Sequence, residues 1–168
     1  MSLVGFSGLK AGQFVKISGK FRDGVGFVAV EITLEPAIDD GEIECVIQNV
    51  DRRRKMLRVC DREIFIPDGI EMKDEEGEVV NSIALKSGDM IKLKGVFTEA
   101  GFAPRKIKLR PAREFNIEQL QGVIARLDHE RRTMLVNGIK VLTTAKTVIE
   151  HGDGSDERRD APVPYIQI

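Results

Sequence analysis

Hydrophobic and polar residues alternate in short runs along most of this chain, and turns containing glycine separate the runs. Val15 and Ile17 lie on one face of such a run, and Ile32 and Leu34 follow beyond a turn. A period of two residues is typical of β-strands with one buried face. The same alternation returns later in the chain at Ile91, Leu93, Ile107 and Leu109. The pattern therefore predicts an all-β protein built from hairpins.

Two glycines interrupt these alternating runs. Gly19 and Gly95 each lie inside a predicted strand, where glycine usually marks a bulge or the sharp bend of a small barrel. Their positions within the two hairpins match, which predicts that both hairpins bend in the same way.

The chain contains an internal repeat. Residues 9–21 align with residues 85–97 at a constant offset, and the match continues from residues 26–37 to residues 101–112 after a one-residue deletion. A second unit also recurs, because residues 43–57 resemble residues 120–135. With the hairpin unit named B and the other unit A, the chain order is B, A, B, A.

One A unit and one B unit together supply five short strands, the number in an OB-type barrel. We predict two tandem OB-like five-stranded barrels. Residues 38–112 form a contiguous barrel, in which Pro67 to Ala84 occupy the place of the connecting helix or loop. Residues 1–37 and 113–150 form a second barrel, closed by both chain ends or by swapping between two chains. A solenoid is the lesser alternative, because it normally needs three or more stacked units.

The composition of the last residues differs from that of the rest of the chain. Residues 152–160 are rich in glycine and charged residues and predict a flexible linker, so residues 151–168 are expected to form a flexible tail. Val163 to Ile168 are the candidate for a terminal strand that adds to an exposed sheet edge.

Several of these segments resemble the bacterial domain-of-unknown-function family 5666, whose modules are OB-like β-barrels. The resemblance covers residues 9–150 and rests on residues 85–95, 122–128, 134–138, 141 and 147–149. These motifs are turn glycines and apolar strand positions, so the resemblance implies a fold and no reaction. The first copy departs from the family pattern, with Cys45 in place of the usual glycine and Cys60-Asp61 where the second copy has Asn137-Gly138.

Composition and charge limit the classes of function that the chain can have. The 168 residues include 26 Lys plus Arg and 27 Asp plus Glu, for a formal net charge of −1, so the whole chain has no global attraction to nucleic acid. No apolar run is long enough to span a bilayer, and residues 1–12 lack the features of a signal peptide. Family members are often exported, so the compartment stays open.

Catalytic and cofactor motifs are not recognisable. Gly24-Val-Gly26 lacks the spacing and the following helix of a phosphate-binding loop, and no serine elbow is present. The two cysteines and two histidines do not have zinc-site spacing. We therefore predict a protein that is not an enzyme and that uses no metal or cofactor.

Cys45 and Cys60 both fall in strand-like segments that flank a tight loop, so they are expected to face one another across a hairpin. Two interpretations stay open. The cysteines are either two small buried hydrophobes in a reduced core or a disulfide formed in an oxidising compartment.

One face of the second-copy hairpin is a candidate binding surface, because it gathers basic residues and carries no acid of its own. The first-copy hairpin mixes lysines with glutamates on the matching face. Crowded like charges cost stability unless something anionic offsets them. The offset is either the acidic segment at residues 68–78 or an anionic polymer. The candidate binding residues, which include a basic loop after the first strand of the A unit, are Lys92, Lys94, Lys106, Lys108, Arg110, Arg52, Arg53 and Arg54.

The sequence thus predicts a binding or assembly module. Protein–protein interaction or self-association, through sheet edges, a swapped barrel or the terminal strand, is the first hypothesis. Nucleic-acid binding through the basic barrel face is the alternative, although the single Tyr and the absence of Trp provide few rings for base stacking.

Overall fold

The computed structural model describes residues 4–36, 40–110 and 117–151, and these residues form an all-β fold, as predicted. They contain twelve strands, two short 3₁₀ turns and no α-helix. The 3₁₀ turns are η1 (Phe6–Gly8) and η2 (Ser82–Ala84). The strands are β1 (Phe14–Arg22), β2 (Gly26–Leu34), β3 (Gly41–Asp51), β4 (Met56–Val59), β5 (Arg62–Phe65), β6 (Glu71–Lys73), β7 (Met90–Thr98), β8 (Gly101–Arg110), β9 (Glu118–Asp128), β10 (Thr133–Val136), β11 (Ile139–Leu142) and β12 (Val148–His151).

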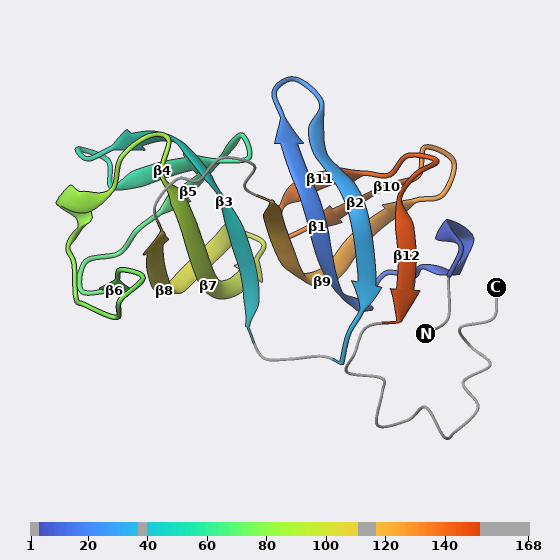
Figure 1. The fold of residues 1–168 in the computed structure, drawn as a ribbon, viewed down its shortest axis with the longest axis horizontal. Coiled ribbons are helices and arrows are strands. Elements are labelled where there is room, and N and C mark those ends of the chain that lie inside the picture. Colours follow the sequence, from blue (N-terminus) through green and yellow to red (C-terminus); the bar gives the residue numbers. More distant parts are fainter. Residues whose placement is uncertain (1–3, 37–39, 111–116, 152–168) are drawn as a thin grey trace.

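Strands from both ends of the described chain close a five-stranded barrel. β9 pairs with β10, β10 with β11, β11 with β2 in parallel, β2 with β1, and β1 again with β9. β12 extends this barrel by pairing in parallel with β2. Figure 1 shows the blue β1–β2 hairpin lying against the orange and red strands although more than 80 residues separate them in the sequence.

The remaining strands, β3 to β8, lie on the other side of the molecule (Figure 1). β3 pairs with β4 and β7, β7 pairs with β8, and β4 pairs with β5. Residues 67–84, predicted to hold a connecting helix or loop, contain β6 and η2, and β6 pairs in parallel with β8. Among the described residues no ladder joins β5 to β8, whereas the corresponding pair of the other side, β11 and β2, is hydrogen-bonded.

A short antiparallel pairing joins the two sides. β3 and β9 meet with Ile43 opposite Leu120, flanked by the pairs Glu42 with Gln121 and Glu44 with Gln119. Residues 43 and 120 open the two copies of the A unit, so each strand pairs with its own repeat counterpart. The sheet is therefore continuous from one side to the other.

The predicted inward faces are buried apart from Leu109, which is partly buried, and the predicted bulges are confirmed. Val15, Ile17, Ile91 and Leu93 lie in one hydrophobic core cluster. The β1–β2 and β7–β8 registers shift at Gly19 and Gly95, where an added Cβ would overlap a carbonyl oxygen of the partner strand. The predicted tail and its terminal strand, residues 152–168, lie outside the described residues.

Candidate functional site

The predicted basic face is assembled by the β7–β8 ladder. Lys92 lies opposite Lys108, and Lys94 lies opposite Lys106, so four ammonium groups share one face of the hairpin. Arg110 continues the row at the end of β8. Like charges directly opposite one another destabilise a sheet, so this face needs compensating negative charge.

Compensation comes from β3, which carries glutamates beside the lysines. Glu42 lies opposite Lys94 and Glu44 opposite Lys92 in the β3–β7 ladder. The carboxylate of Glu42 is 3.7 Å from Lys92 Nζ and 3.5 Å from Lys94 Nζ. The hairpin carries no acid of its own on this face, and the glutamates that the neighbouring strand β3 supplies were not anticipated from the sequence.

Further carboxylates surround the other end of the row. Arg110 makes one ion pair with the buried Glu44 and a second, at 3.6 Å, with Glu75. β6 also places Glu71 opposite Lys106. A groove of about 410 Å³ between the basic face and residues 71–77 is lined by both signs of charge. This mixture lowers the positive potential that a polyanion would encounter.

Two lysines of the basic face keep their charge exposed. Lys106 and Lys108 are exposed side chains, and neither makes an ion pair within 4.0 Å among the residues described. They are the part of the predicted surface best able to meet an external anion.

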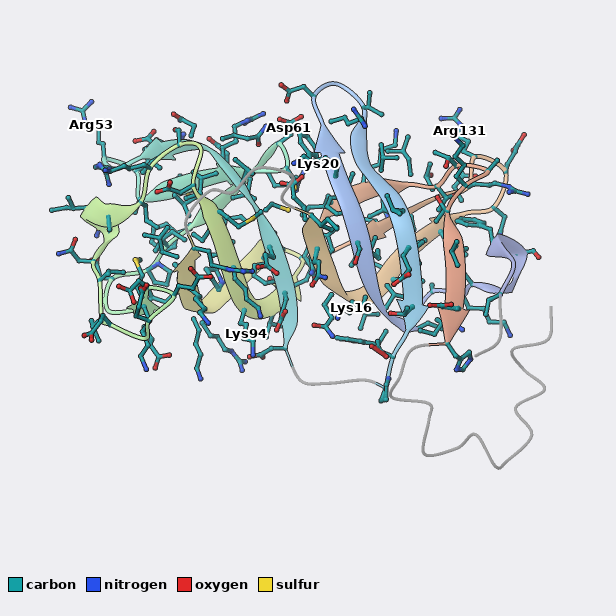
Figure 2. All side chains as sticks on the ribbon, viewed as in Figure 1. Lys16, Lys20, Arg53, Asp61, Lys94 and Arg131 are labelled. Carbon is teal, nitrogen blue, oxygen red and sulfur yellow. The ribbon has the colours of Figure 1, made fainter. Side chains whose placement is uncertain are left out.

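The predicted basic loop, between β3 and β4, divides into three different roles. Arg52 donates to the carbonyl oxygens of Ser82, Ile83 and Leu85 at 2.7, 3.3 and 2.8 Å and so secures η2. Arg54 pairs with Asp51 at 3.8 Å and with Glu63 at 3.4 Å. Arg53 projects from the outer end of the molecule (Figure 2).

A pocket of about 360 Å³ lies beneath this loop, between the β3–β4 hairpin and residues 66–85. Its apolar lining comes from Met56, Leu57, Ile66, Ile70, Met72, Val80 and Leu85. Charged groups stand at its rim, where Lys55 pairs with Asp68 at 2.6 Å and Arg52 holds η2. Sequence reasoning missed this pocket, because its walls come from segments that no motif connects.

The junction between β3 and β9 contains two buried polar side chains that are not among the candidate residues predicted from the sequence. The carboxylate of Glu118, 3% exposed, accepts hydrogen bonds from the backbone N–H groups of Phe21 at 2.7 Å and Val46 at 2.9 Å. Asn137 donates from Nδ2 to the carbonyl oxygens of Glu42 and Gln121, both at 3.0 Å. The period-two pattern offered a signal for Glu118, since it continues the inward series of Leu120 and Ile124.

The two cysteines meet beside this junction. Cys45 Sγ and Cys60 Sγ are 3.0 Å apart, and both residues are buried free thiols. Burial raises the pKa of the Cys45 thiol well above its ordinary value, helped by the hydrogen bond with Cys60 and by the negative charges of Glu118 and Glu44.

The described part of the chain was predicted to hold no metal ion and to have no membrane-spanning segment. No group of three or more His, Cys, Asp or Glu side chains is placed there to hold a metal ion. None of its helical segments is long and apolar enough to cross a membrane.

Comparison with known protein families gives a match to part of the chain. The family model described as "Domain of unknown function (DUF5666)" matches residues 121–166, a shorter stretch than the residues 9–150 over which the resemblance was expected. No curated protein and no solved structure matches the chain significantly.

Proposed function

Since residues 121–166 match the family model of the domain of unknown function DUF5666, whose description names no activity, we propose a function from the geometry of the chain itself. The chain acts as a non-enzymatic binding module that docks a segment of another protein. The pocket beneath the β3–β4 loop carries this proposal, because it combines an apolar lining with a charged rim.

The chemistry of the pocket defines the segment that it fits. Its apolar lining suits one large hydrophobic side chain, which would lose its contact with water there. The rim and the adjacent loop carry Arg52, Arg53, Arg54 and Lys55, and all four residues are exposed. We therefore infer an extended segment with a hydrophobic anchor flanked by acidic residues.

The finer architecture belongs to the same proposal. We infer that the chain is a tandem of two OB-like barrels, one from residues 38–112 and one from residues 1–37 with 113–150. The closed ring of β1, β2, β9, β10 and β11 supports the second barrel. The antiparallel pairing of Ile43 with its counterpart Leu120 supports a two-fold relation between the copies.

A peptide selection tests the docking proposal. A phage-displayed library of random peptides is selected on the whole chain, and the enriched peptides are titrated by fluorescence polarisation. We expect enrichment of a large apolar residue beside Asp or Glu. Ser82→Trp, at an exposed position lining the pocket, should weaken binding at least tenfold by filling the cavity.

Ser87→Trp is the matched control, because Ser87 is also exposed but does not line the pocket. It should leave the affinity unchanged. Selected peptides that lack an apolar anchor, or an equal loss of peptide affinity in both tryptophan variants, would show that the pocket is not the docking site.

Nucleic-acid binding is the second candidate, and the exposed Lys106 and Lys108 favour it. The neighbouring Glu42, Glu44 and Glu75 oppose it, because they pair with the rest of the basic row. Fluorescence anisotropy with labelled single-stranded and duplex oligonucleotides at about 50 and 200 mM salt tests it. Micromolar, salt-sensitive binding that is lost on changing Lys94, Lys106 and Lys108 to Glu would make this face a nucleic-acid site.

A further inference from the structure

Two equivalent hairpin turns place different side chains against the strands beside them. In the β4–β5 turn, Cys60 and Asp61 have left-handed backbones with φ of 51° and 59°. In the β10–β11 turn, Asn137 and Gly138 do the same with φ of 54° and 80°. Each turn directs its first residue toward the neighbouring strand, so Cys60 meets Cys45 where Asn137 meets Gly122.

The cysteine pair is already close to bonding geometry. The two Sγ atoms are 3.0 Å apart, and a disulfide needs about 2.05 Å, so a small movement of the turn suffices. The turn is held in place by Gln48, which accepts from Asp61 N–H at 2.7 Å and donates to Asp61 Oδ1 at 2.9 Å. These bonds keep Cys60 directed at Cys45.

The two thiols differ in access. Cys45 is 0% exposed, whereas Cys60, which is also buried, keeps 4% of its surface exposed. Cys60 lines a pocket of about 420 Å³ between the β1–β2 hairpin tip and the β10–β11 turn, and Arg62 and Lys140 also line it. Figure 2 shows Asp61, the residue after Cys60, at the same upper edge of the molecule as Lys20 of β1. A small solute entering this pocket reaches Cys60 before Cys45.

We propose that Cys45 and Cys60 form a reversible intramolecular disulfide by exchange with a low-molecular-weight disulfide that enters this pocket. The Cys60 thiol loses its proton to solvent and attacks one sulfur of the external disulfide, which releases one external thiolate. Cys45 then loses its proton and attacks Cys60 Sγ, and the second external thiolate leaves. Two protein thiols are oxidised to one disulfide, and one external disulfide is reduced to two thiols.

The order of attack follows from the environment of each sulfur. The thiolate is the reactive form of cysteine, and burial keeps the pKa of Cys45 well above its ordinary value. Attack by Cys45 becomes efficient only once Cys60 carries the leaving group, because the sulfur to be attacked is then held beside it. Arg62 and Lys140 outnumber Asp61 in the lining of this pocket, so the lining carries net positive charge for an anionic disulfide such as glutathione disulfide.

The bond has a structural consequence for an edge that is otherwise weakly held. β5 pairs only with β4 among the described strands, without a ladder to β8. A disulfide from the β4–β5 turn to β3 would fasten this hairpin covalently. In the other copy the β11–β2 ladder and the two hydrogen bonds of Asn137 hold the corresponding turn.

The test begins with the wild-type chain, incubated with glutathione disulfide or with a phosphine reductant. Free thiols are counted after denaturation, and peptides are mapped without reduction. We expect the thiol count to fall from two to none, the intact mass to fall by two hydrogen atoms, and a Cys45–Cys60 linked peptide to appear. Two free thiols after oxidation, or linkage between two chains, would overturn the proposal.

Two single variants test the order of attack. Cys45→Ser should stop at a mixed disulfide of Cys60 with glutathione, whereas Cys60→Ser should leave Cys45 largely unmodified. The reverse pattern would contradict the assigned roles. The double variant Cys45→Gly with Cys60→Asn, which copies the Gly122 and Asn137 pair, is the folding control and should show no response to oxidant.

Discussion

The two ends of the β3–β9 pairing use the same backbone arrangement with different side chains. Beyond the pair of Glu42 and Gln121 lie two glycines, Gly41 and Gly122. Beyond the pair of Glu44 and Gln119 lie Cys45 and Glu118. A hairpin turn meets the strand at each end, bringing Asn137 to the glycine end and Cys60 to the cysteine end.

The difference shows how two strand segments can keep the same backbone pairing while the side chains buried beside them change. At the glycine end, the Asn137 amide occupies space that side chains would otherwise fill and satisfies two backbone carbonyls. At the cysteine end, Glu118 satisfies two backbone N–H groups, and the paired thiols occupy the matching volume. One end is therefore chemically inert and the other is open to oxidation.

The largest effect is expected from removing the carboxylate at the cysteine end. Glu118→Ala leaves the N–H groups of Phe21 and Val46 without their acceptor. Each buried N–H group without an acceptor lowers the free energy of unfolding. We expect the free energy of unfolding of the reduced chain to fall by about 3 kcal/mol, measured by urea denaturation. The exposed Glu130→Ala should change it by less than about 0.5 kcal/mol. Equal effects of the two substitutions would contradict the role of Glu118.

A smaller effect is expected at the glycine end. An added Cβ at Gly122 would lie 2.5 Å from Asn137 Oδ1, so Gly122→Ala should cost about 2 kcal/mol by overpacking. Asn137→Gly removes the obstacle, and in its presence Gly122→Ala should cost much less. A double-mutant cycle measures this coupling. Strictly additive costs would show that Asn137 does not fill the space above Gly122.

The smallest expected effect is a pH dependence of the free energy of unfolding that comes from the cysteine end alone. The pKa of Cys45 is raised in the folded chain, so the folded state keeps the thiol proton at pH values where the unfolded state has lost it. The contribution of this thiol to the free energy of unfolding is fully present below the pKa that the thiol has in the unfolded chain. It is lost as pH rises above about 9, by at most about 1.4 kcal/mol per pH unit.

Denaturation midpoints of the reduced chain between about pH 7 and 10 check this pH effect. Cys45→Gly should show a shallower decline, because the remaining titrating groups are shared by both chains. Parallel pH profiles would exclude Cys45 as the source.

The strands were predictable from the sequence because their signals are local. The repeat and the two-residue period identified the hairpins, and Gly19 and Gly95 marked the bulges. Residues 85–97 could be aligned with residues 9–21 without knowing where either strand lies in space.

The site was less predictable because its partners come from distant parts of the chain. The β7–β8 ladder places the lysines of the basic row on one face, but Glu42 and Glu44 meet that row only through the β3–β7 ladder. The hydrogen bond from Phe21 N–H to Glu118 spans 97 residues, and no local pattern indicates it. The cysteines were expected to face one another, because they flank a hairpin loop, and the structure brings their sulfurs together.

Hydrogen–deuterium exchange of the whole chain tests most directly whether the β3–β9 junction joins the two sides into one body. We expect peptides covering residues 41–46 and 118–123 to exchange as slowly as those from the interior of the closed barrel, since both ends of the junction are secured by buried side chains. Fast exchange at the junction, with slow exchange within β1 and β7, would contradict this and show two sides that open independently.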